Sequence, residues 1–127
     1  MEQKPEIIIT KSDLAQIEAL LASTKPLPDS ADALEGELAR ATVVANDQLP
    51  ANVVAIGSEV TFKIIATGAT FTKVLCLPHE VASVEGGISV FAPIGTAILG
   101  LSEGQQIDWD SPRGQQRIEI IKVAHQD

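Results

Sequence analysis

The feature that most constrains this chain is a short strand that ends at a proline and passes at once into a short apolar helix. Side chains alternate with a period of two over residues 88–91, which predicts a strand. Pro93 has no backbone N–H to donate, so it ends a strand and suits the first turn of a helix. Gly100 suits the position after the last helical residue. The segment therefore predicts a helix packed directly on a sheet.

The residues around that segment have the pattern of a small antiparallel sheet. Val60, Phe62 and Ile64 face one way in a predicted strand, and the residues between them face the other way. Residues 74–77 are apolar on both faces, which is typical of a strand inside a sheet. Glycine-containing turns separate these runs. The C-terminal part is thus expected to be an antiparallel sheet with one short helix.

The last predicted strand, residues 117–123, changes phase part of the way along. Ile118 and Ile120 point one way, and then Ile121 and Val123 take the inward phase. Such a change indicates a β-bulge, because one extra residue shifts the alternation.

The N-terminal part is predicted to contain a short strand and two helices. Residues 6–10 are rich in β-branched side chains, which suit a strand. Thr10 and Asp13 form a capping box, in which the two side chains bond reciprocally to free amides, and a helix follows to about residue 22. Two prolines then end this helix. A second helix, capped by Asp29 or Ser30, is expected to run to about residue 44.

Each of the two helices has an apolar face. The faces are Leu14, Ile17 and Leu21 in the first helix and Leu34, Leu38 and Ala41 in the second.

The two helices are expected to form a short antiparallel hairpin. Each has about 12–15 residues, which at 1.5 Å per residue gives a reach of roughly 18–22 Å. The polar residues 46–52 include a proline and mark the junction with the sheet. We therefore predict an α+β protein with a helical hairpin at residues 1–48 and a second domain at residues 49–127.

Charge is distributed unevenly along this acidic chain. The net charge is −8, and residues 1–50 contain nine acidic but only four basic residues. The sequence has no basic stripe, so direct nucleic-acid binding through phosphate neutralisation is not expected. A basic protein surface is the more natural partner of the N-terminal half.

The small number of cysteine and histidine residues argues against a disulfide and a zinc site. Cys76 is the single cysteine, so no internal disulfide can form. His79 and His125 do not have the spacing of a zinc site with it, and we expect no metal and no cofactor. The chain begins without an apolar signal core, and no apolar run reaches membrane-spanning length. A cytoplasmic protein without membrane contact is expected.

The segment around Pro93 resembles the C-terminal domain of the bacterial Gre transcript-cleavage factors. The shared motif runs through residues 88–100, with further matches at residues 54–60, 103–104 and 118–121. The resemblance implies an FKBP-like fold. It also implies docking on RNA polymerase through Phe91, Ala92, Pro93 and Ile94. An exposed Phe91 would anchor such a contact, because aromatic side chains carry much of the free energy at interface centres.

The whole chain resembles the regulator of nucleoside diphosphate kinase (Rnk) family, which is similar to Gre factors but has a much shorter hairpin. This resemblance is carried by an isoleucine run, a Pro-Leu-Pro break, and residues 32–41 and 90–101. It implies binding to RNA polymerase at the secondary channel, in competition with the cleavage factors. The family name reflects an effect on nucleoside diphosphate kinase, which is therefore a second expected partner, through a direct or an indirect link.

The predicted hairpin tip differs from that of Gre factors, whose adjacent acidic residues help to hold a metal ion at the polymerase active site. The tip residues here are Lys25, Pro26, Leu27, Pro28, Asp29 and Asp32. No acidic pair stands at the apex, and Lys25 has the wrong charge to bind a cation. A short hairpin also leaves Asp29 and Asp32 far from the active centre. We therefore expect a regulator without transcript-cleavage activity, not an enzyme.

Two alternatives stay open from the sequence. The protein could be an active cleavage factor that uses Asp29 and Asp32, although an N-cap and a first-turn acid explain these residues more simply. It could also be an interaction module that acts directly on nucleoside diphosphate kinase. Prolyl isomerase activity is not expected, since three phenylalanines and one tryptophan are too few to line a proline pocket.

Overall fold

Helices and strands follow one another along the chain, which confirms the α+β prediction. The computed structural model describes residues 6–24, 31–111 and 114–125. The elements in chain order are β1 (Ile8–Thr10), α1 (Lys11–Ser23), α2 (Ala31–Arg40), β2 (Thr42–Val44), η1 (Asn46–Gln48), β3 (Ser58–Ile64), β4 (Thr70–Cys76), η2 (Pro78–Ser83), β5 (Gly87–Ser89), α3 (Pro93–Ile98), β6 (Gln106–Ser111) and β7 (Gly114–His125), where η marks a 3-10 helix.

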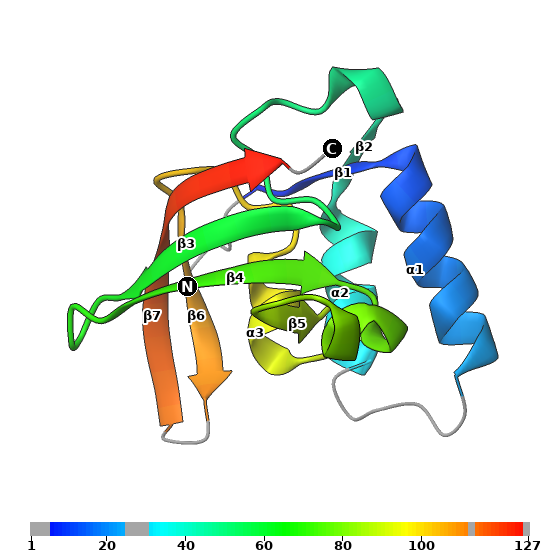
Figure 1. Cartoon of the computed structure of the whole chain (residues 1–127). Helices are drawn as coiled ribbons and strands as arrows, with labels where there is room; N and C mark the ends of the chain where they lie inside the picture. The colour runs from blue at the N-terminus through cyan, green and yellow to red at the C-terminus, as the bar shows by residue number, and fades with distance from the viewer. Residues whose placement is uncertain (1–5, 25–30, 112–113, 126–127) are drawn as a thin grey trace.

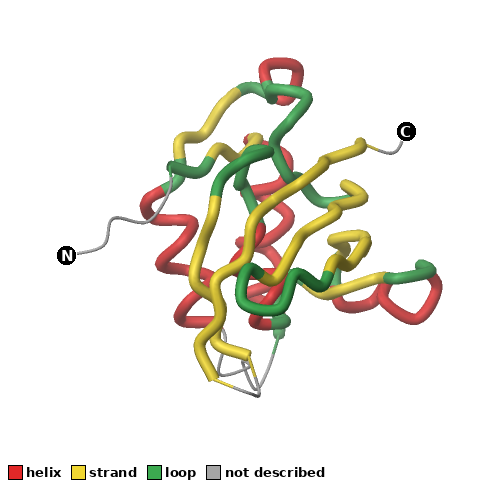
Figure 2. Tube along the Cα trace, turned by 90° about the vertical axis from the view of Figure 1, so that its left-hand side faces the viewer, coloured by secondary structure: helices red, strands yellow, loops and turns green. Residues whose placement is uncertain are grey.

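A five-stranded sheet lies on one side of the molecule and the α-helices lie on the other. Its strand order is β5-β4-β3-β7-β6, and a smaller sheet pairs β1 with β2. α3 packs against β6, α2 packs against α3, and α1 lies beyond α2 (Figure 1). Figure 2 shows the α-helices behind and beside the strands when the molecule is seen from the sheet side. Val60, Phe62 and Ile64 of β3 are buried in the core, as their alternation predicted.

β7 contains the predicted β-bulge. Thr61 pairs with Lys122, but the next residue, Phe62, pairs with Ile120, so Ile121 is the extra residue. Ile120 is fully buried, whereas Ile121 is 44% exposed. The predicted bulge is confirmed and the predicted inward orientation of Ile121 is wrong, because the extra residue itself absorbs the change of phase.

One edge of the larger sheet departs from the antiparallel prediction. β5 pairs with β4 in parallel, because the chain crosses over through η2 before it returns to the sheet. The strand predicted over residues 88–91 ends earlier, at Ser89. The Ser89 carbonyl accepts a hydrogen bond from the N–H of Ala92, and the Ser89 hydroxyl accepts one from the N–H of Phe91, each over 3.0 Å. These two bonds close the turn that leads into α3.

The second helix is shorter than the sequence predicted. α2 ends at Arg40, not at residue 44, and residues 42–44 form β2, which pairs in parallel with β1. Thr-Val-Val is a β-branched run, and such side chains favour a strand when a partner strand is present. The partner is the strand expected near residues 6–10, which is thereby confirmed as β1.

A hydrophobic core shared by both parts of the chain joins the N-terminal part to the larger sheet. It contains Ile9 and Ile17 together with Leu34, and these pack in one cluster with side chains of the sheet and of α3. β1 is held there by a hydrogen bond of 3.1 Å from the N–H of Ile8 to the carbonyl of Gly100. Gly100 follows α3 with a φ of 80°, which confirms it as the residue that ends the helix. A Cβ at this position would lie 2.9 Å from that of Ile7, so the close approach of β1 requires glycine.

Candidate protein-interaction site

The turn between β5 and α3 carries the four residues predicted to dock on a partner. Phe91 is only 8% exposed and its ring belongs to the core, so it is not an exposed anchor. Pro93 is exposed, and Ala92 and Ile94 beside it are half-buried. The surface of this turn is therefore formed mainly by Pro93, with partial contributions from its two neighbours.

Two close contacts fix the shape of this turn. The buried hydroxyl of Thr96 donates a hydrogen bond of 2.8 Å to the carbonyl of Val90. A Cβ built on Gly95 would lie 2.0 Å from the Ser89 carbonyl oxygen, so only glycine lets the start of α3 approach β5 this closely. The sequence pattern Pro-Ile-Gly-Thr thus encodes a closely packed surface turn.

The predicted hairpin tip lies largely outside the described residues. This holds for Lys25, Pro26, Leu27, Pro28 and Asp29. Asp32 is described; it is exposed in the first turn of α2, where its negative charge complements the helix dipole. Across residues 6–24, 31–111 and 114–125, no three His, Cys, Asp or Glu side chains gather in a way that could hold a metal ion.

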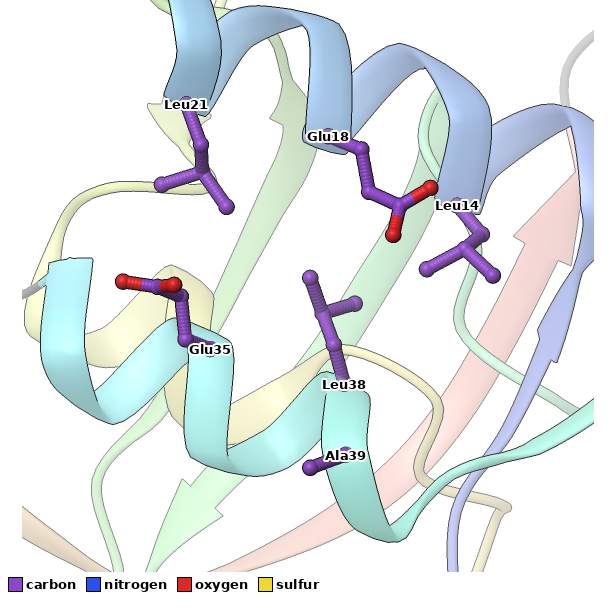
Figure 3. A pocket seen from close by; sticks show the side chains of 6 residues that line it. All are labelled: Leu14, Glu18, Leu21, Glu35, Leu38 and Ala39. Atoms are coloured by element: carbon purple, nitrogen blue, oxygen red, sulfur yellow. The ribbon is translucent and has the colours of Figure 1, made fainter.

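A groove of about 460 Å³ runs between α1 and α2. Figure 3 shows its lining from both helices: Leu14, Glu18, Leu21, Glu35, Leu38 and Ala39. Leu21 points toward α2 and Leu38 points toward α1, so apolar side chains form its floor. The sequence predicted apolar faces on both helices, but the more deeply buried members of those faces, Ile17 and Leu34, enter the core and leave these leucines half-buried.

The rim of this groove is acidic. Glu18 of α1 and Glu35 of α2 are both exposed on its two sides. Among the described residues, neither carboxylate has a hydrogen-bond or ion-pair partner. The next acid along α2, Glu37, differs: it is 5% exposed and accepts a hydrogen bond of 2.8 Å from Arg40 Nε. The two rim carboxylates are thus available for a positively charged partner.

Asp13 fixes the start of α1 against the segment that precedes β3. Thr10 caps the helix, and its hydroxyl accepts a hydrogen bond of 3.1 Å from the N–H of Asp13. The predicted capping box is only half formed, because the Asp13 carboxylate accepts a 3.0 Å bond from the N–H of Ile56. Burial raises the pKa of the Asp13 carboxyl above its ordinary value, although the Ile56 bond and nearby His125 act in the opposite direction. The Asp13 side chain thus makes a long-range contact with Ile56 in place of the local bond that a capping box would contain.

The cysteine and the two histidines lie in separate environments. Cys76 is buried in β4, where burial, and to a smaller extent nearby Glu80, raise the pKa of its thiol. His125 Nδ1 lies 3.2 Å from the Ser58 hydroxyl at the end of the sheet. His79 is exposed in η2. A buried thiol with a raised pKa carries little thiolate at neutral pH, so Cys76 is a structural side chain and not a nucleophile.

Comparison with protein families assigns both halves of the chain. Residues 49–125 match the family described as "Transcription elongation factor, GreA/GreB, C-term", and residues 5–44 match "Rnk N-terminus".

No helix within the described residues is both long enough and apolar enough to cross a membrane.

Known relatives agree with this assignment. The regulator of nucleoside diphosphate kinase of Escherichia coli K12 is 34% identical over 126 residues, which cover 97% of this chain and 92% of that protein. Transcription elongation factor GreA of Nitratidesulfovibrio vulgaris is 35% identical over 91 residues, which cover 72% of this chain but only 57% of that protein. A solved GreA/GreB elongation factor from Nitrosomonas europaea is 37% identical with a TM-score of 0.76; the match covers 96% of this chain and all of that one.

The five-stranded sheet with α3 is thus a GreA/GreB-type C-terminal domain, preceded by an Rnk-type N-terminal segment. The chain belongs to the family of regulators of nucleoside diphosphate kinase, which is related to the GreA/GreB transcription elongation factors. The Escherichia coli relative is named for regulation and not for catalysis.

Proposed function

We propose that this protein binds RNA polymerase in the region of the secondary channel, competes there with Gre-type factors, and does not support transcript cleavage. Its membership of a family related to GreA and GreB supports the choice of polymerase as partner. In this proposal the functional parts are residues 1–48, in which α1 and α2 form the helical hairpin, and an FKBP-like docking domain at residues 49–127.

The observation that carries this proposal is the length of the two helices. α1 has 13 residues and α2 has 10, so at 1.5 Å per residue neither helix is longer than about 20 Å, and Ile17 and Leu34 pack both helices on the common core. Gre factors, by resemblance, place their acidic tip at the end of a long coiled coil. Two short helices can occupy the entrance of a channel, but they are too short to carry Asp29 and Asp32 to the polymerase active centre.

Docking is assigned to the turn between β5 and α3. Pro93 supplies its exposed surface, with Ala92 and Ile94 beside it, while Phe91 supports the turn from the core. The Thr96 bond to Val90 and the tight packing at Gly95 keep this turn rigid. A rigid surface loses little conformational entropy on binding, which favours affinity.

The acidic character of the N-terminal half predicts how the complex responds to salt. Nine acidic and four basic residues lie among the first 50. Attraction to a basic channel rim speeds association more than it fixes affinity, and salt screens it. We expect the association rate to fall as ionic strength rises, with a smaller change in the dissociation rate.

Binding of the fluorescently labelled protein to core RNA polymerase tests the docking turn. Pro93→Glu introduces a charge at the exposed first position of α3, where a glutamate is compatible with the helix. Pro50→Glu, at another exposed proline, is the matched control. The proposal requires weaker polymerase binding by Pro93→Glu and unchanged binding by Pro50→Glu; equal affinities of both variants would contradict the docking role.

Stalled elongation complexes separate the proposed regulator from the cleavage-factor alternative. We expect no shortened transcripts when the wild-type protein is added to complexes that GreA cleaves. Shortened transcripts that disappear with the Asp29→Ala, Asp32→Ala double variant would instead establish cleavage activity.

Direct action on nucleoside diphosphate kinase is a second candidate function, favoured by the name of the Escherichia coli relative. Co-purification from lysate followed by binding of the two purified proteins separates the two functions. Polymerase subunits in the captured fraction support the first function, and direct binding to the purified kinase without polymerase supports the second.

A further inference from the structure

We propose that the groove between α1 and α2 is a docking site for a positively charged amphipathic helix of a partner protein. It is separate from the turn at Pro93 and does not depend on the polymerase proposal. The groove has an apolar floor, formed by the half-buried side chains Leu14, Leu21 and Leu38 (Figure 3). Its two walls belong to different helices, so the groove exists only because the fold sets them side by side.

The packing of the two helices explains why the groove stays open. α1 packs mainly against β1 and β2, whereas α2 packs mainly against α3. Ile17 and Leu34 are buried in the core, whereas Leu14, Leu21 and Leu38 are half-buried and line the open groove between the two helices. Half-buried leucines along an open groove between two helices are the arrangement in which a third, amphipathic helix is received.

The length of the floor fits a helical occupant. Leu14 and Leu21 are seven residues apart on α1, which is about 10.5 Å along the helix axis. A helix lying along the groove presents apolar residues at the same spacing, at positions i, i+3 or i+4, and i+7. Two turns of an incoming helix therefore meet apolar side chains along the whole floor.

The charge of the rim determines the sign of the partner. Glu18 and Glu35 are exposed on opposite sides of the floor, and neither has a partner among the described residues. An occupant with lysine or arginine on both flanks of its apolar stripe would pair with both carboxylates. A second copy of this chain would instead place its own acidic rim against them, and an anionic membrane surface would be repelled in the same way.

The probe for this site is a synthetic amphipathic helical peptide with leucines at helical spacing and lysines on both flanks, titrated into the full-length protein. The Glu18→Lys, Glu35→Lys double variant should weaken binding about tenfold, because two attractions become repulsions. The matched control is Asp47→Lys, Glu85→Lys, which changes the net charge equally at exposed positions outside the groove. It should retain binding.

A second pair of variants tests the apolar part without changing charge. Ala39→Gln places a larger side chain in the lining of the groove, whereas Ala33→Gln adds the same side chain elsewhere on the exposed surface of α2. Only Ala39→Gln should weaken binding of the peptide. Chemical shift changes on binding should centre on the methyl groups of Leu14, Leu21 and Leu38.

Several results would overturn the proposal. These are equal weakening by the groove variant and its charge-matched control, equal binding of a peptide with glutamates in place of the lysines, and no binding of the lysine peptide at millimolar concentration. Concentration-dependent dimerisation that the Glu18→Lys, Glu35→Lys variant abolishes would identify a second copy of the chain as the occupant instead.

Discussion

The carboxylate of Asp13, in the first turn of α1, accepts a hydrogen bond of 3.0 Å from the backbone N–H of Ile56, 43 residues further along the chain. This bond ties the start of the helical part to the segment that leads into β3. Ser58 lies two residues later, where its hydroxyl accepts a bond from the N–H of Ala55 and contacts His125 at the end of β7. The position of α1 therefore depends on the C-terminal domain, and not on its own helix signals alone.

Removing the Asp13 carboxylate should destabilise the protein more than neutralising it. Asp13→Ala leaves the N–H of Ile56 without its partner, which costs about 1–3 kcal/mol of the free energy of unfolding. Asp13→Asn keeps an acceptor oxygen and removes a buried charge, so its stability at neutral pH should equal or exceed that of the wild type. Urea denaturation measures both; an Asp13→Ala variant as stable as the wild type would show that this bond does not hold α1.

The same pair of proteins has a defined pH dependence. Burial raises the pKa of Asp13 in the folded protein above the ordinary value of 3.8, so the folded state binds this proton more tightly than the unfolded state. Stability of the wild type relative to Asp13→Asn should therefore fall as pH rises from 3.8 through the raised pKa, and stay level above it. A relative stability that increases with pH in this window would mean that the Ile56 bond and His125 outweigh burial, which contradicts the raised pKa.

Two glycine-to-alanine substitutions should act in opposite directions. Gly36 lies inside α2 with nothing within 4 Å of a built Cβ, so Gly36→Ala should stabilise the protein by about 0.5–1 kcal/mol. Gly95→Ala forces a Cβ to within 2.0 Å of the Ser89 carbonyl oxygen, and such overpacking costs about 1–3 kcal/mol or more. Thermal unfolding distinguishes them; a neutral Gly95→Ala would mean that α3 does not approach β5 as closely as described.

The β-bulge predicts different costs at two adjacent isoleucines. Ile120→Ala removes a fully buried side chain and should cost about 2–5 kcal/mol. Ile121→Ala removes the exposed bulge residue and should cost less than about 1 kcal/mol. Chemical denaturation of both variants tests the register directly, since a strand without the bulge would reverse or equalise the two costs.

Cys76 should be protected from thiol reagents in the folded protein. Its side chain is 2% exposed, and burial raises the pKa of the thiol, so little thiolate is available at pH 7 to 8. We expect reaction with a thiol reagent to be slow in buffer and rapid after denaturation, which serves as the control. Rapid reaction of the native protein would contradict the buried position of β4.

Much of the fold follows from local patterns in the sequence. The alternation in β3, the Pro93 and Gly100 boundaries of α3, the Thr10 cap of α1 and the bulge in β7 are each encoded within a few residues. The parallel pairings were not predicted, since β1 meets β2 across two helices and β4 meets β5 across η2. Contacts between distant segments leave no periodic signal in the sequence. The observed end of α2 differs from the predicted one for that reason, because residues 42–44 pair with β1.

The candidate sites show the same division. The sequence located the turn at residues 91–94, but the burial of Phe91 depends on how α3 and β5 pack and is not visible in the pattern. Apolar positions at Leu14, Leu21 and Leu38 were visible as helix faces. In the structure these three leucines line an open groove, while Ile17 and Leu34 enter the core. This difference depends on the angle and distance between the two helices, which the sequence pattern does not contain.

Competition with GreA for RNA polymerase tests whether this protein occupies the site of Gre-type factors. Fluorescently labelled GreA is first bound to core polymerase, and the unlabelled protein is then added while the anisotropy of the label is followed. We expect the protein to displace labelled GreA fully at saturation, while stalled complexes treated with it show no transcript shortening. Retention of GreA on polymerase at a protein concentration far above that of polymerase would show that the two proteins do not share a binding site.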